Sequence, residues 1–280
     1  MKHFPAVPLT LSLLLLAADS VNAQSEALPP KTAASTGWRK LVPGIELGLF
    51  PAPGGQGQMQ IVRVDARSHP LQLCSSSARQ PMLTVEEWAA KQKLCLVINA
   101  GMYDKDGSTH CGYLKNHGVI LPAVFRSDYS SICVFSPLAQ EAAPFRLLDT
   151  DNASVEKNIL SQYAVAVQNL RLIKHPGENR WKQQPKMWSE AALGEDKDGN
   201  ALFIFCRTPS TMHDFNEHLL KLPINLVSAQ HLDGGPPASF YLNCGGVVIR
   251  GMGSYESGFN ENTSSQKFWL LPHVIGVKTP

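Results

Sequence analysis

Three short, wholly apolar runs constrain the fold of this chain most. Cys95–Ile98, Ile132–Phe135 and Ala164–Val167 each place four apolar residues in a row. Runs of this length are too short for a buried helix and are typical of strands covered on both faces. The sequence therefore predicts central strands inside a sheet-rich protein.

Patterned segments surround these runs and indicate the rest of the fold. Ile45–Phe50 and Met59–Val64 alternate apolar and polar residues around a glycine-rich turn, so a hairpin is expected. Further strands are predicted at Ala191–Leu193, Leu202–Cys206, Val227–Leu232, Ser239–Leu242 and Val247–Arg250. Helices are predicted at Thr84–Lys91 and Thr211–Lys221, where a threonine precedes an acid by three residues. Together these elements predict an α+β fold: one domain, residues 38–280, of twisted mixed or antiparallel sheets with a few helices.

The N-terminus has the three parts of a signal peptide. Lys2 supplies a positive start, Pro8–Ala18 is an apolar run, and Val21–Ala23 places small residues at a cleavage position. The run is too short for a membrane span, which takes roughly 20 apolar residues. Residues 1–23 are therefore predicted to be removed, and residues 24–37 to form a flexible lead-in. The mature protein is expected to be periplasmic or secreted, without a membrane anchor.

Charge bears on the possible partners of the protein, and cysteine content bears on disulfides and metal sites. The formal net charge is +2 and no basic tract stands out, which argues against a nucleic-acid partner. The six cysteines are an even number, which suggests disulfides in an exported protein. Buried thiols are the alternative for Cys95, Cys133 and Cys206, which lie in apolar runs. The spacing matches no zinc pattern, so the sequence calls for no cofactor and leaves a divalent cation open.

Two predicted strands end in polar residues followed by glycine. Asn99 precedes Gly101, and its amide would either hold a ligand hydroxyl or cap the loop. Asp233 precedes Gly234 and Gly235, whose backbone N–H groups would form an anion-binding nest. A common Asp-Gly turn is the alternative. We predict that these strand ends meet at one ligand site.

Cationic residues follow two other strands. Arg171 comes after the run that ends in Gln168 and Asn169, and Arg207 comes just before the helix that contains His213. Each arginine would bind a phosphate, and His213 would donate a proton or bind phosphate. Ordinary surface roles are the alternatives for Arg171 and His213.

The motifs at these strand ends resemble those of the phosphodiester glycosidase family. The resemblance lies in Asn99–Tyr103, Gly112–Leu114, Gln168–Ile173, Leu193–Asp196 and Leu232–Pro236, in order over Leu41–Val277. Other recognisable catalytic motifs are missing: the chain has no serine nucleophile elbow, no H-E-x-x-H and no P-loop. The resemblance implies cleavage of a sugar phosphodiester at the anomeric carbon, which releases sugar and a phosphomonoester.

The resemblance also implies that Asn99, Gly101, Gln168, Asp233 and Gly234 border the active site. The predicted catalytic residues are Asp233 and Asn99. The predicted substrate-binding residues are Gly101, Met102, Gly112, Gln168, Asn169, Arg171, Arg207, His213, Gly234 and Gly235. Asn169–Arg171 stands where eukaryotic members carry a Ser-Gly-Pro-type segment, which bears on the phosphate clamp. The expected partner is a sugar phosphate or glycan, and the alternative function is a non-catalytic protein that binds such a ligand.

Overall fold

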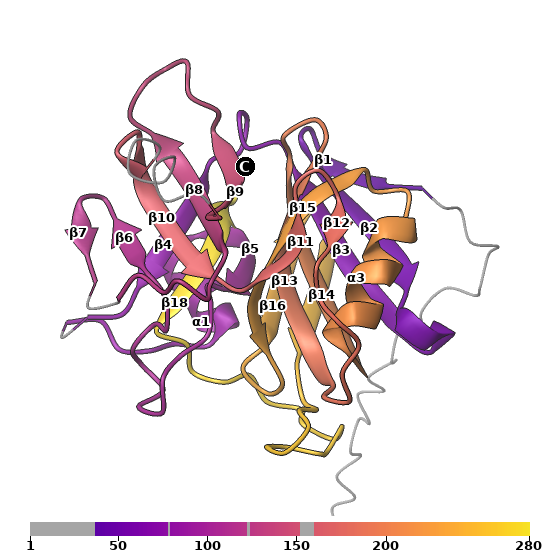
Figure 1. The fold of residues 1–280 in the computed structure, drawn as a ribbon. Helices are drawn as coiled ribbons and strands as arrows, with labels where there is room; N and C mark the ends of the chain where they lie inside the picture. The colour runs from indigo at the N-terminus through magenta and orange to yellow at the C-terminus, as the bar shows by residue number, and fades with distance from the viewer. Residues whose placement is uncertain (1–36, 78, 122–123, 152–159) are drawn as a thin grey trace, which may run out of the picture. The chain divides into compact units, whose positions relative to one another are not determined.

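Antiparallel strand pairing organises the protein (Figure 1). The computed structural model describes residues 37–77, 79–121, 124–151 and 160–280, so the predicted signal peptide and most of the predicted lead-in lie outside the described residues. Strands make up 48% of the residues that the structure describes. Every pairing between described strands is antiparallel, and two α-helices have described bounds. The expected α+β class is therefore better stated as mostly β, with residues 36–280 forming one compact unit.

The first sheet has eight strands and carries the hairpin predicted at the N-terminal end. In spatial order these are β1 (Arg39–Val42), β2 (Ile45–Pro51), β3 (Gln58–Val64), β14 (Ala201–Ser210), β13 (Trp188–Asp196), β15 (Leu226–Gly234), β11 (Arg171–Lys174) and β12 (Glu178–Asn179). A short 3-10 turn, η1 (Pro53–Gly55), joins β2 to β3. Gly54 and Gly55 take positive φ there, which glycine adopts without steric cost.

Two five-stranded sheets complete the β-structure. One is ordered β7 (Val119–Ile120), β6 (Leu114–Asn116), β10 (Tyr163–Asn169), β8 (Ser131–Pro137) and β9 (Phe145–Asp149). The other is ordered β17 (Val247–Met252), β16 (Ser239–Cys244), β5 (Leu94–Asn99), β18 (His273–Lys278) and β4 (Leu71–Ser75). The three apolar runs of the sequence lie within β5, β8 and β10, so the prediction of buried strands there is confirmed.

One core cluster joins the three sheets. It contains Phe203 and Phe205 of β14, Ile98 of β5 and Val165 of β10, all fully or almost fully buried. A buried polar contact also ties the sheets together, because the amide of Gln230 on β15 donates to the carbonyls of Ser131 and Val167, at 3.0 Å each. The strand ends that carry polar residues are therefore held in a fixed relation.

Each helix covers the outer face of one sheet. α3 (Met212–Lys221) packs Phe215 and Leu219 on the eight-stranded sheet, and α1 (Val85–Gln92) packs Trp88 on the sheet that contains β5 (Figure 1). The predicted capping box of α1 is present, with reciprocal bonds between Thr84 and Glu87. At α3 the Thr211 side chain accepts the Asp214 N–H.

All six cysteines are free thiols, and the expected disulfides are not formed. Five of them are buried in the sheets, and only Cys111 has intermediate exposure. Burial raises the pKa of Cys74 to about 11 and those of Cys95 and Cys206 to about 12, so these thiols stay protonated at neutral pH. The alternative of buried apolar thiols holds for Cys95, Cys133 and Cys206. In the part of the chain that the structure describes, no helix is long and apolar enough to cross a membrane.

Candidate active site

A shift in strand register brings two functional side chains to the end of β15. Asp233 lies opposite Ala191 of β13, and His231 lies opposite Ala192, so Leu232 is an extra residue between them. Such a β-bulge bends the strand and re-aims its side chains, and bulges are common beside active sites. The bulge therefore lies between His231 and Asp233, close to the C-terminal end of β15.

His231 is held by a buried carboxylate from the neighbouring strand. Its Nδ1 lies 2.6 Å from Oε1 of Glu190, and the indole of Trp188 donates to Oε2 of the same carboxylate at 2.7 Å. Burial lowers the pKa of His231, but the Glu190 contact more than offsets this and the net pKa is raised. Glu190 therefore orients the ring and favours the imidazolium form.

Two further carboxyl groups lie beside this pair. Burial raises the pKa of Asp233 to about 7, against the opposing effects of His231 and of the Gly234 N–H, and Glu256 adds to the rise. Burial also raises the pKa of Glu256. A carboxyl group with a pKa near neutrality is half ionised at pH 7, which suits proton transfer. We call Trp188, Glu190, His231, Asp233 and Glu256 the Asp233 site.

Three ring side chains form a cluster beside the loop after β5. The rings of Tyr103, His110 and His273 are 6.2 to 6.5 Å apart, and the Tyr103 hydroxyl donates to the His273 carbonyl at 2.8 Å. The pKa of Tyr103 is raised by burial and, to a smaller extent, by the charge of Asp233. Burial lowers the pKa of both histidines to about 4, so they are neutral at physiological pH.

The predicted polar residues of β5 and β10 support the loops of the site. The Asn99 side-chain oxygen accepts the Ser239 N–H at 3.0 Å, and Asn169 donates to the Ala100 carbonyl at 2.9 Å. Gln168 uses its whole amide: it accepts the N–H groups of Tyr113 and Arg126 and donates to the carbonyls of Arg126 and Tyr129. A fully satisfied amide holds its surroundings rather than a ligand.

Among the described residues, two amide atoms at these strand ends have no partner although they are buried: Nδ2 of Asn99 and Oδ1 of Asn169. An unsatisfied buried polar atom is costly, so each is a natural contact for a ligand group. Sequence alone left Asn99 open between holding a ligand and capping a loop, and the geometry allows both, one through each end of its amide.

The predicted glycines are sites of close packing. A Cβ on Gly101 would lie 2.3 Å from the His110 ring, one on Gly112 2.4 Å from the Gln168 carbonyl, and one on Gly234 2.2 Å from the Trp188 ring. Met102 is partly exposed, and its carbonyl accepts the Cys111 N–H at 2.9 Å. These positions shape the walls of the site because no side chain fits there.

The predicted anion nest after Asp233 is not formed. The Gly234 N–H donates to the carboxylate of Asp233 at 2.8 Å, and the Gly235 N–H donates to the Ser189 carbonyl at 2.9 Å. Both amides are therefore engaged within the protein. Gly235 has a φ of +63° and packs against the carboxyl group of Glu256, which explains the need for glycine there.

The three predicted cationic contacts lie outside the Asp233 site. Arg207 donates to the carbonyls of Met252, Thr263 and Ser265, so it ties down the loop after β17. His213 pairs with Asp214 at 3.2 Å in the first turn of α3. The structure gives both residues structural partners.

Arg171 pairs with Asp149 at 3.2 Å and Asp151 at 2.9 Å. It also lines a cavity of about 290 Å³ with Lys182, Arg180 and Leu170. The carbonyl of Leu170 accepts the backbone N–H of His231 at 2.9 Å, so this basic cavity adjoins the strand that carries the site. The phosphate contact for Arg171 stays a prediction.

Arg126 is a cation that the sequence patterns did not single out. Burial and neighbouring charges that include Asp233 raise the pKa of Tyr129 to about 12, while Arg126 acts on it in the opposite direction. The charges of Arg126 and Asp233 thus act on the same Tyr129 hydroxyl in opposite directions. Arg126 stacks on that ring at 4.6 Å and pairs with the exposed Asp128 at 2.7 Å, a surface pairing that a stronger anion can displace.

The sequence also gave little sign of Glu190, Glu256, Tyr103, His110 and His273. Glu190 offered one signal: it is a lone acid within a run that ends in Ala191–Leu193, and a charge in a buried strand needs a partner. The others come from loops and the C-terminal strand, and only the fold brings them together. Among the residues described, no three His, Cys, Asp or Glu side chains converge as metal ligands.

The chain belongs to the phosphodiester glycosidase family, whose sequence profile matches residues 92–278. The matched region contains the whole Asp233 site. No curated protein matches the sequence significantly.

Solved structures show the same fold at low sequence identity. The catalytic domain of zebrafish N-acetylglucosamine-1-phosphodiester alpha-N-acetylglucosaminidase, auto-inhibited by its pro-peptide, is similar with a TM-score of 0.57 and 16% identity, over 84% of this chain and 82% of that one. A hypothetical protein from Synechocystis has a TM-score of 0.53 and 16% identity, over 83% and 61%. A protein described as a candidate exported protein of Burkholderia pseudomallei has a TM-score of 0.50 and 9% identity, over 82% and 75%.

Proposed function

We propose that this protein is an exported hydrolase that cleaves a sugar-1-phosphodiester at the anomeric carbon. The observation that carries the proposal is the Asp233 site: a carboxyl group with a pKa of about 7 beside a histidine held by Glu190. Membership of the phosphodiester glycosidase family supports the reaction type. The activity named for the zebrafish neighbour suggests the first substrate class to test.

The proposed reaction breaks the bond between the anomeric carbon and the phosphate oxygen. Water supplies the oxygen that becomes the sugar hydroxyl, and the phosphate leaves with both electrons of the broken bond as a monoester. A phosphate monoester is a good leaving group because its second pKa is about 6. Protonation of the leaving oxygen is therefore less necessary than for an alcohol, which normally requires a dedicated carboxylic acid.

Asp233 acts in its ionised form in this proposal. As a base it would take a proton from the attacking water, and as a nucleophile it would attack the anomeric carbon itself; both roles need the carboxylate. His231, held as an imidazolium by Glu190, lies close enough to lower the pKa of Asp233 and would stabilise negative charge on the phosphate oxygens.

The phosphate end of the substrate is proposed to lie toward Arg126. This guanidinium stacks on the Tyr129 ring at 4.6 Å, and its partner Asp128 lines the basic cavity. Lys182 and Arg171 in that cavity would attract the anionic substrate. Arg126→Gln should raise KM more than it lowers kcat if its role is binding.

The direct test is hydrolysis of the methyl diester of N-acetylglucosamine 1-phosphate in ¹⁸O-labelled water. Cleavage at the anomeric carbon places ¹⁸O in the sugar, whereas attack at phosphorus places it in the phosphate. Mass spectrometry of both products distinguishes the two. We expect label in the sugar, and Asp233→Asn should lower kcat/KM by about 10²- to 10⁴-fold.

A matched control lies on the same strand pair. Asp198 is an exposed aspartate in the turn between β13 and β14, at the other end of the hairpin from Glu190. Asp198→Asn should retain full activity. Label in the phosphate would overturn the proposed bond cleavage, and equal activity of Asp233→Asn would remove Asp233 from its role. Binding of the diester without any turnover would support the alternative, a non-catalytic binding protein.

The proposed location outside the cytoplasm rests on the signal-peptide pattern of residues 1–23. A fold neighbour described as a candidate exported protein is consistent with it. N-terminal sequencing of the protein recovered from outside the cytoplasm should begin near Gln24. Recovery of the uncleaved chain from the cytoplasm alone would contradict the proposal.

A further inference from the structure

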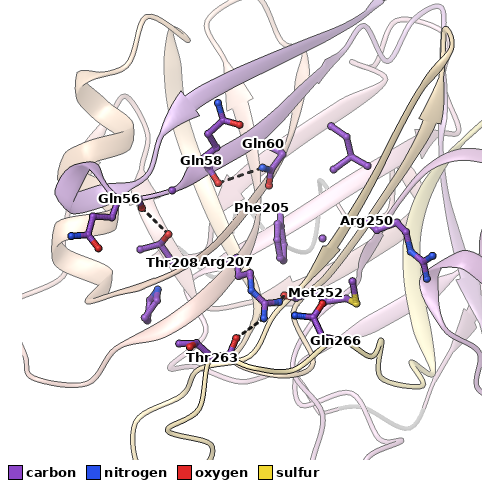
Figure 2. Close-up of a pocket in the computed structure, with 14 residues that line it drawn as sticks. Gln56, Gln58, Gln60, Phe205, Arg207, Thr208, Arg250, Met252, Thr263 and Gln266 are labelled. Carbon is purple, nitrogen blue, oxygen red and sulfur yellow. Dashed lines mark hydrogen bonds between the residues drawn. The ribbon is translucent and has the colours of Figure 1, made fainter. Parts of the chain in front are cut away.

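A second cavity, separate from the Asp233 site, lies where the apolar layer between two sheets ends. Its volume is about 530 Å³, within the range of small-molecule sites. Phe205 of β14 lies directly opposite Gln60 of β3 and is almost fully buried beneath the pocket, whose accessible apolar surface comes from residues such as Ile249 and Met252. Figure 2 shows Gln58 and Gln60 on one side of Phe205, with Arg207 and Met252 on the other. We call this cavity the glutamine pocket.

Neutral amides provide most of the free polar groups of the pocket. Among the described residues, the side-chain amides of Gln56, Gln58 and Gln266 make no hydrogen bond to protein. Gln60 uses only its NH₂ group, which donates to the Gln58 carbonyl at 3.3 Å (Figure 2). Each free amide offers two donor sites and an acceptor oxygen.

The two charged side chains that line the pocket, Arg207 and Arg250, already have partners in the protein. Arg207 donates to three backbone carbonyls, those of Met252, Thr263 and Ser265. Arg250 points away from Phe205 and pairs with Glu86 at 2.6 Å (Figure 2). None of the described residues that line the pocket is a carboxylate. The pocket therefore presents mainly neutral polar groups, because Arg207 is bonded to backbone carbonyls and Arg250 points away from Phe205 (Figure 2).

We infer that the glutamine pocket binds a neutral sugar residue. A sugar ring presents neighbouring hydroxyl groups at its rim, which a primary amide can both donate to and accept from. It also presents an apolar C–H face, which fits the partly exposed side chains of Ile249 and Met252. The combination of a mostly apolar surface and a few convergent polar groups is typical of ligand sites.

A peptide is the main rival occupant, because β17 is an edge strand and borders the pocket. Peptide strands bind such edges through a row of free backbone groups. Here the Met252 carbonyl is taken by Arg207, so that edge is interrupted at the pocket. The geometry favours the sugar.

The pocket shares a wall with the segment that carries Glu256. Arg207 holds the loop from Met252 to Ser265, and within that loop the Gly253 N–H donates to the Ala238 carbonyl at 2.7 Å. A Cβ on Gly253 would lie 2.1 Å from the carbonyl oxygen of Gly235, so the loop packs directly on the turn after Asp233. A sugar in the pocket is therefore one short loop from the proposed reaction centre. The inference about binding does not rest on the proposed function.

The test measures binding directly, with the full mature chain. A glycan array of neutral and charged oligosaccharides is screened, beside an array of uncharged peptides. The neutral disaccharide that binds most strongly is then titrated by calorimetry into the wild-type protein, the Gln58→Ala/Gln266→Ala variant and Gln140→Ala. Gln140 is an exposed glutamine outside the pocket, and it serves as the matched control.

We expect a neutral disaccharide to bind, the double variant to weaken binding at least tenfold, and the control to change it less than twofold. The double variant should unfold at the wild-type temperature, because both side chains are exposed and unpartnered. Asp233→Asn should bind the disaccharide as wild type does, which separates this site from the proposed reaction centre. Binding only to charged glycans or to peptides, or equal binding by the double variant, would overturn the inference.

Discussion

The Asp233 site and the glutamine pocket are both lined by polar side chains. The side chains of the Asp233 site can gain and lose protons, whereas the amides of the glutamine pocket cannot. The Asp233 site gathers three carboxyl groups and a histidine, and burial raises the pKa of Asp233 to about 7. The glutamine pocket offers amides and a hydroxyl, with its arginines committed to backbone carbonyls and to Glu86. One region can transfer protons near neutral pH, and the other can only bind.

Burial affects carboxylates and amides differently. Removing a carboxylate from water costs free energy and shifts its pKa toward the working range of an enzyme. An amide does not titrate, so it stays a neutral hydrogen-bond donor and acceptor at every pH, whatever surrounds it. Four experimental changes test this difference between the two regions.

The largest effect is expected from loss of the carboxylate that holds His231. Glu190→Gln should lower kcat/KM on the diester by roughly 10²- to 10³-fold, because the ring loses its orientation and its imidazolium form is no longer favoured. Steady-state kinetics measure this effect. Glu195→Gln is the matched control: it is also a buried glutamate of β13, but it accepts the Leu147 N–H and pairs with Arg146. A comparable fall in activity for both variants would show a general effect of charge loss in the strand.

The next effect is a gain in stability when the buried carboxylate of Asp233 is removed. The pKa of Asp233 is raised from 3.8 to about 7 in the folded chain, so the folded state holds its proton more tightly than the unfolded state. Wild-type stability therefore falls as pH rises from about 4 to 7, and the full cost applies above pH 7. Asp233→Asn avoids that cost and should be more stable at pH 8 by up to about 4 kcal/mol. Urea unfolding at pH 8 and pH 4 tests this, and an equal difference at both pH values would contradict it.

A moderate loss of stability is expected from Arg207→Met. The substitution keeps the apolar stem but removes three bonds to carbonyls of the loop after β17, so the free energy of unfolding should fall by about 2 kcal/mol. The loop also forms a wall of the glutamine pocket, so neutral-sugar binding should weaken with it. Hydrogen exchange of the loop amides measures the loosening. Unchanged protection there would show that the loop is held by other contacts.

The smallest effect is expected for binding to the glutamine pocket as pH changes. Its free polar groups do not titrate, so the affinity for the neutral disaccharide should vary less than twofold between pH 5 and 8. Over the same range kcat/KM for the diester should rise with an apparent pKa near 7, because Asp233 acts as the carboxylate. Parallel calorimetry and kinetics make the comparison. If the affinity for the disaccharide changed with pH in the same way as kcat/KM, the two regions would have to be treated as one site.

Much of the fold could be predicted from local pattern. The strands in β2, β3, β5, β8 and β10 and the starts of both helices follow from apolar runs, alternation and threonine caps. The balance of classes was less accurate, since the described chain is mostly β. Expected disulfides were wrong because an even cysteine count does not show which thiols lie within bonding distance.

The candidate site was predictable only in part. Asp233 and Asn99 stand at strand ends and within motifs, so local sequence marked them. Arg207 and the Gly235 N–H bond to carbonyls of distant segments, and the Gly234 N–H bonds to the neighbouring Asp233 carboxylate, so the ligand contacts expected of them stay predictions. A donor looks free in a sequence until the fold shows what accepts from it.

Local sequence was enough to indicate the sheet-rich class, the family and the carboxylate at the end of β15, because each depends on residues that are near one another in the chain. The folded chain was needed to show that Glu190 holds His231, that Glu256 reaches Gly235, and that free glutamines gather around Phe205. These contacts join residues from different strands and loops. Their energies depend on burial and distance, which no local pattern of residues contains.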